Sequence, residues 1–461
     1  MPRDRREGLL PFEFVAEDEG PAVTSWSGLT LLVDMMRHLG LPAAAKALAI
    51  RERPTGYDEF QLLTAFVLLL TAGGDGFDDI RPLRQDAALA KLLGHSLPSA
   101  DVLRRTLEMF HEKEVAARRS ETGAWIAPEN ERLAALGRLH AHLAAAYATY
   151  VKDASTTATL DIDATIIEST KREAFAHYKG GRGYQPVAAL WAEANVVVAD
   201  QFRDGNVPAG MDNVTVIDAA LKALPASVKE VRLRADSALY EQKVLRRLVE
   251  KNVAFVISAD MSKQLRELCV ATPDKAWSVL ERRSDLVVEL AEVEFTPDDA
   301  WPKNAKPLRT IALRFKKDQG ALFANLDDTK FFAVVTNREG NAAELVRWHR
   351  MKAGTIEHLH DVTKNDLGAG TMPSGKLGAN AAWYRLNLIT FSLLSLLKQI
   401  ALDDSMKDAR PKRLRLHVFA VAARVTSHAR GLFARVAQWA FTTLEGARCR
   451  LDELVSMPAP A

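Results

Sequence analysis

The order of short apolar runs between residues 155 and 260 constrains the fold of this chain more than any other feature. Runs rich in Val, Ile, Leu and Ala, such as A-T-L-D-I-D-A-T-I-I and V-A-F-V-I-S-A-D, are typical of strands. Two stretches with helical spacing, N-V-T-V-I-D-A-A-L-K-A-L and Y-E-Q-K-V-L-R-R-L-V-E-K-N, lie among them. The predicted order is strand, strand, strand, helix, strand, helix, strand. This order indicates a mixed α/β sheet with helices packed on it.

The segments on either side have a different texture. Residues 1–150 carry apolar residues at three- and four-residue spacing and predict helices. Three apolar runs separated by polar, Pro-containing segments predict a β-rich insertion over 260–337. We therefore expect a helical N-terminal region (1–150), a core in two pieces (151–259 and 338–400), the insertion, and a basic helical C-terminal region (401–461).

Composition narrows the class of protein. The chain has 461 residues, of which 48% are hydrophobic and 26% charged, as in a folded globular protein. Its two cysteines, Cys269 and Cys449, exclude a disulfide scaffold and a cysteine-based zinc cluster. We find no secretory signal, and the apolar runs 62–72 and 386–402 are too short or too polar for a bilayer. The sequence predicts a soluble, cytoplasmic protein that has no membrane partner.

Two acidic residues lie on the first predicted strand. In T-L-D-I-D-A-T the side chains of Asp161 and Asp163 share one face, because side chains alternate along a strand. Two carboxylates on one face of an apolar strand are costly unless a cation neutralises them. A divalent metal ion is one such cation. Ion pairs with nearby Lys or Arg, or a solvated edge strand, are the alternatives.

Two later segments carry further acids. Asp236, in V-R-L-R-A-D-S-A-L-Y, lies where a strand ends, and ligands bind at the carboxyl ends of strands in open α/β sheets. It is also a good N-cap for the next helix. In T-I-E-H-L-H-D-V-T-K-N-D-L, one helix face carries Glu357, His360, Asp361 and Lys364. That face is alternatively a solvated, salt-bridged stripe.

Together the acids form an ordered set: one on a first strand, one at the end of a later strand and one on a helix after the insertion. Such a set can hold two Mg²⁺ ions about 4 Å apart, which stabilise the attacking and leaving oxygens of an in-line phosphoryl displacement. Because Mg²⁺ keeps several of its waters, three acids suffice.

At these residues the chain resembles the DDE transposases of bacterial insertion sequences, and the thirteen-eighty group in particular. The segments that carry the resemblance span roughly 155–400 and keep the family's order: LDIDATIIEST, YKGGRGYQPVAALWAE, FRDGNVPAGMDN, LRADSALY, and GTIEHLHDVTKNDL followed by GANAAWYRLNLITFSLLSLL. The resemblance implies an RNase H-like catalytic core. It also implies metal-dependent DNA cleavage and strand transfer with Mg²⁺, which Mn²⁺ can replace. The implied partners are double-stranded DNA (transposon ends and target) and a second copy of the chain when DNA is bound.

Individual roles follow from the same resemblance. The catalytic acids would be Asp163, Asp236 and Glu357, with Asp161 as a rival first ligand. Lys364, seven residues after the Glu, would contact a phosphate. The family's Tyr and Arg before the Glu are missing, since Arg350 and Ala353 occupy those positions. Arg350 or Lys352 would take over their contact with the transposon end, and residues 1–150 would serve in DNA binding or dimerisation.

Two loops and the C-terminal segment offer further candidates. K-G-G-R-G-Y-Q-P brings Lys179 and Arg182 to a glycine-rich turn suited to a sugar-phosphate backbone, unless it is a plain hairpin turn. R-D-G-N (203–206) indicates a turn in which Asn206 either orients the site or serves the turn alone.

The net charge of +2 conceals an uneven distribution. Residues 405–450 contain ten basic and two acidic side chains, so this segment carries +8 and the remainder −6. If the segment is helical, His417, Arg424, His428 and Arg435 form one stripe. A cationic stripe suits DNA phosphates. A solvated face, or pairing with the acidic N-terminal region, is the alternative.

Three other functions remain open at this point. A metal-dependent nuclease would cut DNA without joining strands. A domesticated, non-catalytic DNA-binding protein would keep the fold alone, and the missing Tyr and Arg leave this possible. A glycosidase with two carboxylates would need neither a metal nor a basic segment.

Overall fold

The computed structural model describes residues 22–50, 55–284, 286–295, 307–317, 329–428 and 431–454. Helices dominate the N-terminal part, as predicted. Their bounds are α1 Leu29–His38, α2 Leu41–Lys46, α3 Glu59–Ala72, α4 Ile80–Gln85, α5 Ala87–Leu93, α6 Ala100–Glu108, α7 Lys113–Ala116 and α8 Glu131–Tyr150. Of the described helices none alone has the length and apolar content to span a bilayer, although α3 with Phe77–Gln85, bent by 92°, passes that test as a pair.

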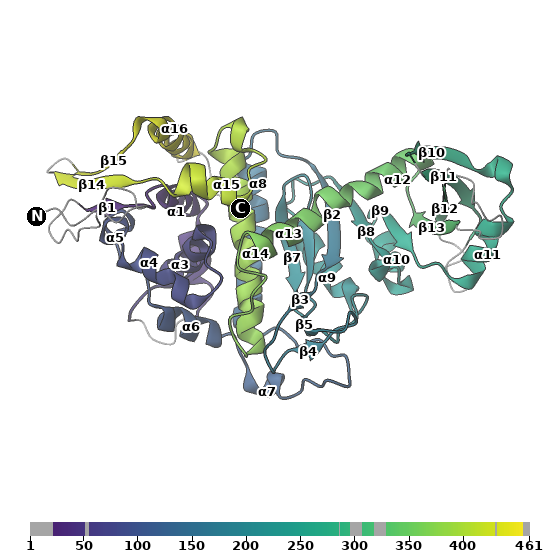
Figure 1. Cartoon of the computed structure of the whole chain (residues 1–461), viewed down its shortest axis with the longest axis horizontal. Coiled ribbons are helices and arrows are strands. Elements are labelled where there is room, and N and C mark those ends of the chain that lie inside the picture. The colour runs from purple at the N-terminus through teal and green to yellow at the C-terminus, as the bar shows by residue number, and fades with distance from the viewer. Residues whose placement is uncertain are drawn as a thin grey trace, which may run out of the picture.

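A large mixed sheet forms the centre of the molecule (Figure 1). Its core strands are β2 Thr157–Ala164, β6 Val187–Trp191, β7 Val196–Gln201, β8 Glu230–Ala235 and β9 Ala254–Ala259. They lie in the order β9-β8-β2-β6-β7; β8 runs parallel to β2 and β9, while β6 is antiparallel to β2 and β7 is antiparallel to β6. Between them in the chain come α9 Asn213–Ala223 and α10 Gln242–Glu250. The prediction of a mixed α/β sheet flanked by helices is confirmed.

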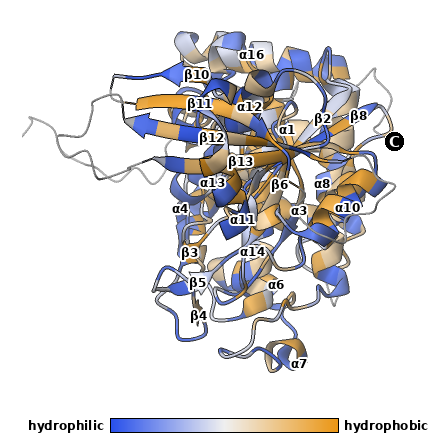
Figure 2. Cartoon of the chain, turned by 90° about the vertical axis from the view of Figure 1, so that its right-hand side faces the viewer, coloured by the Kyte–Doolittle hydropathy of each residue, from blue (hydrophilic) through white to orange (hydrophobic). Residues whose placement is uncertain are grey.

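The predicted insertion is β-rich and extends the same sheet. Its strands are β10 Ser278–Arg282, β11 Leu286–Val293, β12 Arg309–Lys317 and β13 Lys330–Thr336, and α11 Lys263–Ala271 precedes them. Because β13 pairs antiparallel with β9, all nine strands form one continuous sheet. Figure 2 shows apolar residues along β11 and β13, and α12 Ala342–Arg350 packs on these strands through Leu345 and Val346.

One long buried helix connects the sheet to the N-terminal helices. This helix, α14 Leu377–Ile400, packs against α8, α3 and β7 and is buried along almost its whole length. In Figure 1 it runs between the N-terminal helices and the sheet. Helix α13 Ile356–Asn365 precedes it and packs against β2. Its position places the motif around Glu357 beside the strand that carries Asp163.

A small three-stranded sheet covers one end of β2. It consists of β3 Ile167–Glu168, β5 Arg182–Tyr184 and β4 Phe175–Ala176, in that order. The glycine-rich segment is the turn between β4 and β5, and Gly180 there has a φ of 93°, which favours glycine. The segment therefore forms a hairpin turn.

The C-terminal region corrects a prediction. Helices α15 Pro411–Leu414 and α16 Gln438–Glu453 are present, but the segment between them includes a hairpin of β14 Ala423–His428 and β15 Gly431–Val436. Strand β1 Val23–Thr24 pairs with β14 to complete a second small sheet. The expected helical stripe is wrong, because β14 alternates buried Ala423 and Val425 with exposed Arg424 and so has the period of a strand.

Candidate active site

Asp163 and Asp236 meet at one edge of the sheet. Strands β2 and β8 are parallel and pair Ile162 with Ala235. The residues that follow this pair, Asp163 on β2 and Asp236 directly after β8, therefore bring their carboxyl groups to the same edge. The Asp236 carboxyl group lies close enough to the Asp163 carboxyl group to raise its pKa. Asp236 Oδ1 also accepts a hydrogen bond from the Ala238 backbone N–H at 3.1 Å, which makes Asp236 an N-cap as well. The sequence prediction that these two acids converge is supported by this geometry.

The contact between two acids changes the charge of the site. Burial, together with Asp236, raises the pKa of Asp163 to about 7, while the nearby Lys352 acts in the opposite direction. Without another cation, the pair therefore keeps one proton over much of the neutral and acidic range. A divalent cation would replace that proton and remove the repulsion, so the donor set fits a hard metal ion.

A cleft of about 640 Å³ opens over the two acids. Lys179 and Lys364 line it together with Asp163 and Asp236. Lys364 Nζ donates a hydrogen bond to the Ile166 carbonyl at 3.0 Å, which directs it across the end of β2. Burial and Lys179 lower the pKa of Lys364. The structure thus brings four of the predicted site residues to one cleft.

Asp161 has a different environment. Arg234 Nε and Nη2 donate to its two carboxylate oxygens, each at 2.7 Å, and Thr355 Oγ1 donates to it as well. The Asp161 and Arg234 side chains are 0% and 3% exposed. Asp161 therefore forms the ion pair that the sequence left open as an alternative, and we leave it out of the proposed metal ligands.

Glu357 lies in the first turn of α13 and is exposed. It does not line the cleft over Asp163 and Asp236. Within the described part of the chain, no three His, Cys, Asp or Glu side chains already surround one point as metal ligands. Two of the three predicted acids are thus in contact, and the third lies nearby on the helix that packs against β2.

The cleft also contains residues that the sequence analysis did not select. His177, Tyr178 and Gln185 line it, all from the segment around the glycine-rich turn. His360, one turn after Glu357 on α13, does not line the cleft but lies behind Asp163, with Nε2 3.9 Å from Asp163 Oδ2. Its spacing of three from Glu357 and four from Lys364 was the available signal, but we interpreted it only as a shared helix face.

Two predicted DNA contacts form surface ion pairs instead of lining the cleft. Arg350 Nη1 lies 3.2 Å from Glu281 of β10. Arg182 Nη2 donates to Glu121 Oε1 and to the Arg172 carbonyl, both at 2.9 Å.

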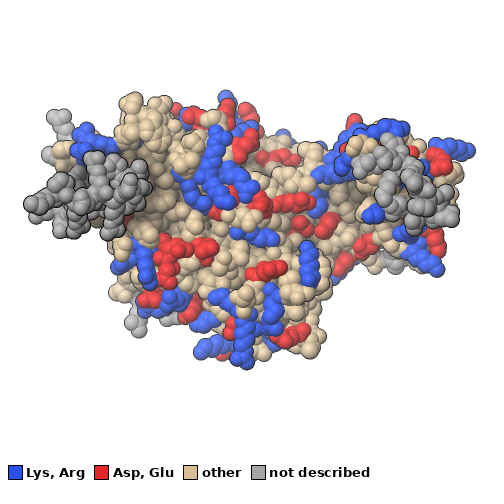
Figure 3. Space-filling model, in the orientation of Figure 1, with Lys and Arg blue, Asp and Glu red and all other residues tan. Residues whose placement is uncertain are grey.

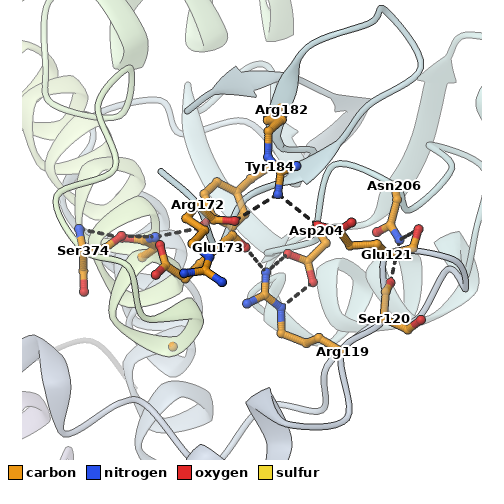
Figure 4. Close-up of polar contacts among 12 residues, drawn as sticks. Arg119, Ser120, Glu121, Arg172, Glu173, Arg182, Tyr184, Asp204, Asn206 and Ser374 are labelled. Carbon is orange, nitrogen blue, oxygen red and sulfur yellow. Dashed lines mark hydrogen bonds and ion pairs between the residues drawn. The ribbon is translucent and has the colours of Figure 1, made fainter. Parts of the chain in front are cut away.

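A buried ion pair fastens the small sheet to the segment after α7 (Figure 4). Arg119 Nε and Nη2 donate to the two Asp204 carboxylate oxygens at 2.8 and 2.5 Å. The Asn206 side-chain amide donates to the Ser120 and Glu121 carbonyls at 2.9 and 3.3 Å. The R-D-G-N turn therefore holds this segment in place, and Asn206 serves that contact instead of orienting the acids.

The basic C-terminal residues divide into two groups. Several form internal contacts: Arg410 and Lys412 pair with Asp366, Arg415 donates to the Thr71 and Asp366 carbonyls, Arg448 pairs with Asp34, and Arg450 pairs with Asp403. Figure 3 shows basic side chains with acidic neighbours around the place that α15 occupies in Figure 1. By contrast, Arg424 and Arg435 are exposed and lie directly opposite each other on β14 and β15.

Comparison with known proteins identifies the family to which the chain is similar. Residues 12–445 match the family model described as Transposase DDE domain group 1. Among solved structures, the chain is similar to piggyBac transposase in a cryo-EM structure of its synaptic complex with hairpin DNA. The two share 10% identity at a TM-score of 0.44, over 95% of this chain and 83% of that one. No curated protein matches the sequence.

Proposed function

The chain belongs to the family of transposases described as Transposase DDE domain group 1, and on that premise we propose that it binds the terminal inverted repeats of its own element, cleaves DNA there and transfers the strands. Within the family we place it among transposases of bacterial insertion sequences, in the thirteen-eighty group. The motifs L-D-I-D-A-T, L-R-A-D-S-A-L-Y and T-I-E-H-L-H-D-V-T-K support this placement.

The contact between Asp163 and Asp236 is the observation that carries the proposal. These two carboxylates, with Glu357 as the third acid, would hold Mg²⁺ or Mn²⁺. When bound, such ions supply Lewis acidity and lower the pKa of a bound water at the scissile phosphodiester. Lys364 and Lys179 line the same cleft, where their ammonium groups would bind the phosphate oxygens and orient the backbone for in-line attack.

The DNA would reach beyond the cleft. Lys352 lies close enough to Asp163 to affect its pKa, so a phosphate on one side of the acids would contact Lys352. Arg350 and Arg182 form surface ion pairs, which contribute little stability because solvent screens them and which can be exchanged for phosphate. On the hairpin, Arg424 and Arg435 would contact duplex DNA away from the cleaved bond. We further propose that two copies of the chain hold two element ends together.

One observation favours a second candidate, a non-catalytic DNA-binding protein. Glu357 is exposed and does not line the cleft. A protein that no longer cleaves DNA would tolerate Glu357 in this exposed position, whereas a transposase needs Glu357 beside Asp163 and Asp236.

End cleavage separates the two candidates. Purified protein would be incubated with labelled duplex DNA that carries the inverted repeats flanking its reading frame, with Mg²⁺ or with EDTA. We expect cleavage at the repeat ends only with Mg²⁺, and none from Glu357→Gln, which still binds the DNA. Asp361→Asn, four residues later on the same helix, where Asp361 pairs with Arg410 away from the acids, serves as the matched control and cleaves normally. Binding without cleavage by the wild-type protein would establish the non-catalytic candidate. Strand joining, assayed with added target DNA, distinguishes a transposase from a nuclease.

A further inference from the structure

A buried imidazole lies against the acidic pair and has no hydrogen-bond partner. The His360 residue is 7% exposed, and its Nε2 lies 3.9 Å from Asp163 Oδ2. Among the described residues, neither Nδ1 nor Nε2 of His360 forms a hydrogen bond. Buried ring nitrogens nearly always have a partner, because an unpaired buried polar atom costs about 1–3 kcal/mol. The missing partner points to a ligand.

The Nε2 atom of this ring faces the Asp163 carboxylate. An imidazole nitrogen is a common metal ligand in proteins. Two ligand atoms that each lie about 2.1 Å from one cation are separated by roughly 3 to 4 Å. The separation of 3.9 Å between Nε2 and the Asp163 carboxylate is therefore compatible with one shared ion.

We propose that His360 is a nitrogen ligand of the divalent cation held by Asp163 and Asp236, in addition to the acids. The inference rests on the proposed function, because it takes the acidic pair as a metal site. It also predicts the metal preference. Carboxylates alone suit Mg²⁺, whereas an imidazole nitrogen shifts relative affinity toward transition-metal ions. The site should therefore prefer Mn²⁺ to Mg²⁺ more strongly than an all-oxygen site does.

Two other histidines of the chain provide internal controls. His358 lies on the same helix two residues earlier, and burial with Arg410 lowers its pKa. It lines a separate small cavity beside Arg410. His177 lines the cleft, but its Nε2 faces Gly181 of its own hairpin so closely that a Cβ there would lie 2.7 Å away. His358 thus lies outside the cleft, and the two ring nitrogens of His177 face its own hairpin, Nδ1 accepting from the Lys179 backbone N–H.

Pulsed electron paramagnetic resonance of the Mn²⁺-loaded full chain tests the proposal without DNA. A coordinated imidazole gives a ¹⁴N modulation of the Mn²⁺ echo. We expect this modulation in the wild-type protein, in His358→Gln and in His177→Gln, and its loss in His360→Gln. Isothermal titration should show Mn²⁺ affinity reduced roughly ten- to hundredfold in His360→Gln. Mg²⁺ affinity should fall less.

The possible failures are distinguishable. Mn²⁺ binding without ¹⁴N modulation in the wild-type protein would overturn the role of His360 and leave the proposed function intact. Loss of modulation in His177→Gln but not in His360→Gln would show that the nitrogen ligand is His177 and not His360. If the wild-type protein bound no Mn²⁺, both the metal site and the function built on it would fail. Because the first of these measurements uses unmodified protein, misfolding of a variant cannot obscure it.

Discussion

The middle and the end of strand β2 place two aspartates, only two residues apart, in opposite electrostatic environments. Asp161 lies in a closed ion pair with Arg234, whereas Asp163 lies beside another carboxyl group, Asp236, which raises its pKa. Both aspartates lie on the same face of the strand; Arg234 is on β8 and Asp236 directly follows it. The register of the parallel pair places Asp161 opposite Arg234. It therefore creates two adjacent cross-strand pairs, which we call the attractive row (Asp161 and Arg234) and the repulsive row (Asp163 and Asp236). The attractive row stabilises the fold, and the repulsive row is the proposed cation site.

The largest effect should come from breaking the attractive row. Asp161→Asn leaves the Arg234 guanidinium buried without a counter-charge, so we expect a loss of about 3–5 kcal/mol in the free energy of unfolding. Urea denaturation measures this loss. The matched control is Glu230→Gln, which removes the partner of Arg232 from a pair with the same two-bond geometry at the surface. Glu230→Gln should lower the free energy of unfolding by about 1 kcal/mol or less. If the Asp161→Asn protein is stable but no longer binds the cation, the metal ligand is Asp161 instead.

The next effect concerns the repulsive row. Asp163→Asn removes one carboxylate of the cation site, and we expect roughly a hundredfold or greater loss of Mn²⁺ affinity together with loss of end cleavage. The stability without metal should stay the same or rise, because a repulsive contact disappears. Calorimetric titration and thermal unfolding measure the two quantities. A destabilised Asp163→Asn protein that still binds Mn²⁺ would show that the two rows have been assigned in reverse.

The pH dependence of stability should reveal the proton that Asp163 carries in the folded protein. The pKa of Asp163 is raised to about 7 in the folded protein, against 3.8 for the ordinary side chain. Between these values the folded state binds a proton that the unfolded state lacks, so the contribution of Asp163 to stability falls as the pH rises from about 4 to about 7. Unfolding midpoints in EDTA at pH 5 and pH 8 should differ less in Asp163→Asn than in the wild-type protein. An equal difference in both would mean that Asp163 does not carry the proton.

The smallest expected effect lies in a second like-charged row, at the C-terminal hairpin. Arg424 faces Arg435 across the strands, and like charges opposite each other are unfavourable unless an anion lies between them. If DNA phosphates supply that anion, Arg424→Ala with Arg435→Ala should weaken duplex binding and reduce the slope of log affinity against log salt by about 1.8. Fluorescence anisotropy at several salt concentrations measures this slope.

The control for the hairpin lies at the other end of the molecule. Arg266→Ala with Lys275→Ala removes two exposed cations of the insertion and should leave the salt slope nearly unchanged. Equal effects of both double variants would show that DNA binding depends on overall charge and not on the hairpin.

Much of the catalytic core could be predicted from local patterns. The strand and helix order from β2 to β9 follows from apolar runs whose period is short-range, and the convergence of Asp163 and Asp236 follows from two acids at strand ends. The C-terminal hairpin could not be recognised in the same way. Arg424, His428 and Arg435 satisfy a helical spacing, but β14 pairs with β1, whose residues are about 400 positions away in the sequence. That pairing decides the period in favour of a strand.

The sequence by itself determined the class of fold, the ordered acids and the uneven distribution of charge, because each depends on residue type and on spacing within a single element. Only the tertiary structure decided which aspartate faces a cation and which faces another acid, since that depends on the register between β2 and β8. It also decided that His360 lies against Asp163, because α13 packs on β2 after an insertion of strands. Charge pairing between distant elements is a property of the packed chain, and the sequence lists only the groups that can take part.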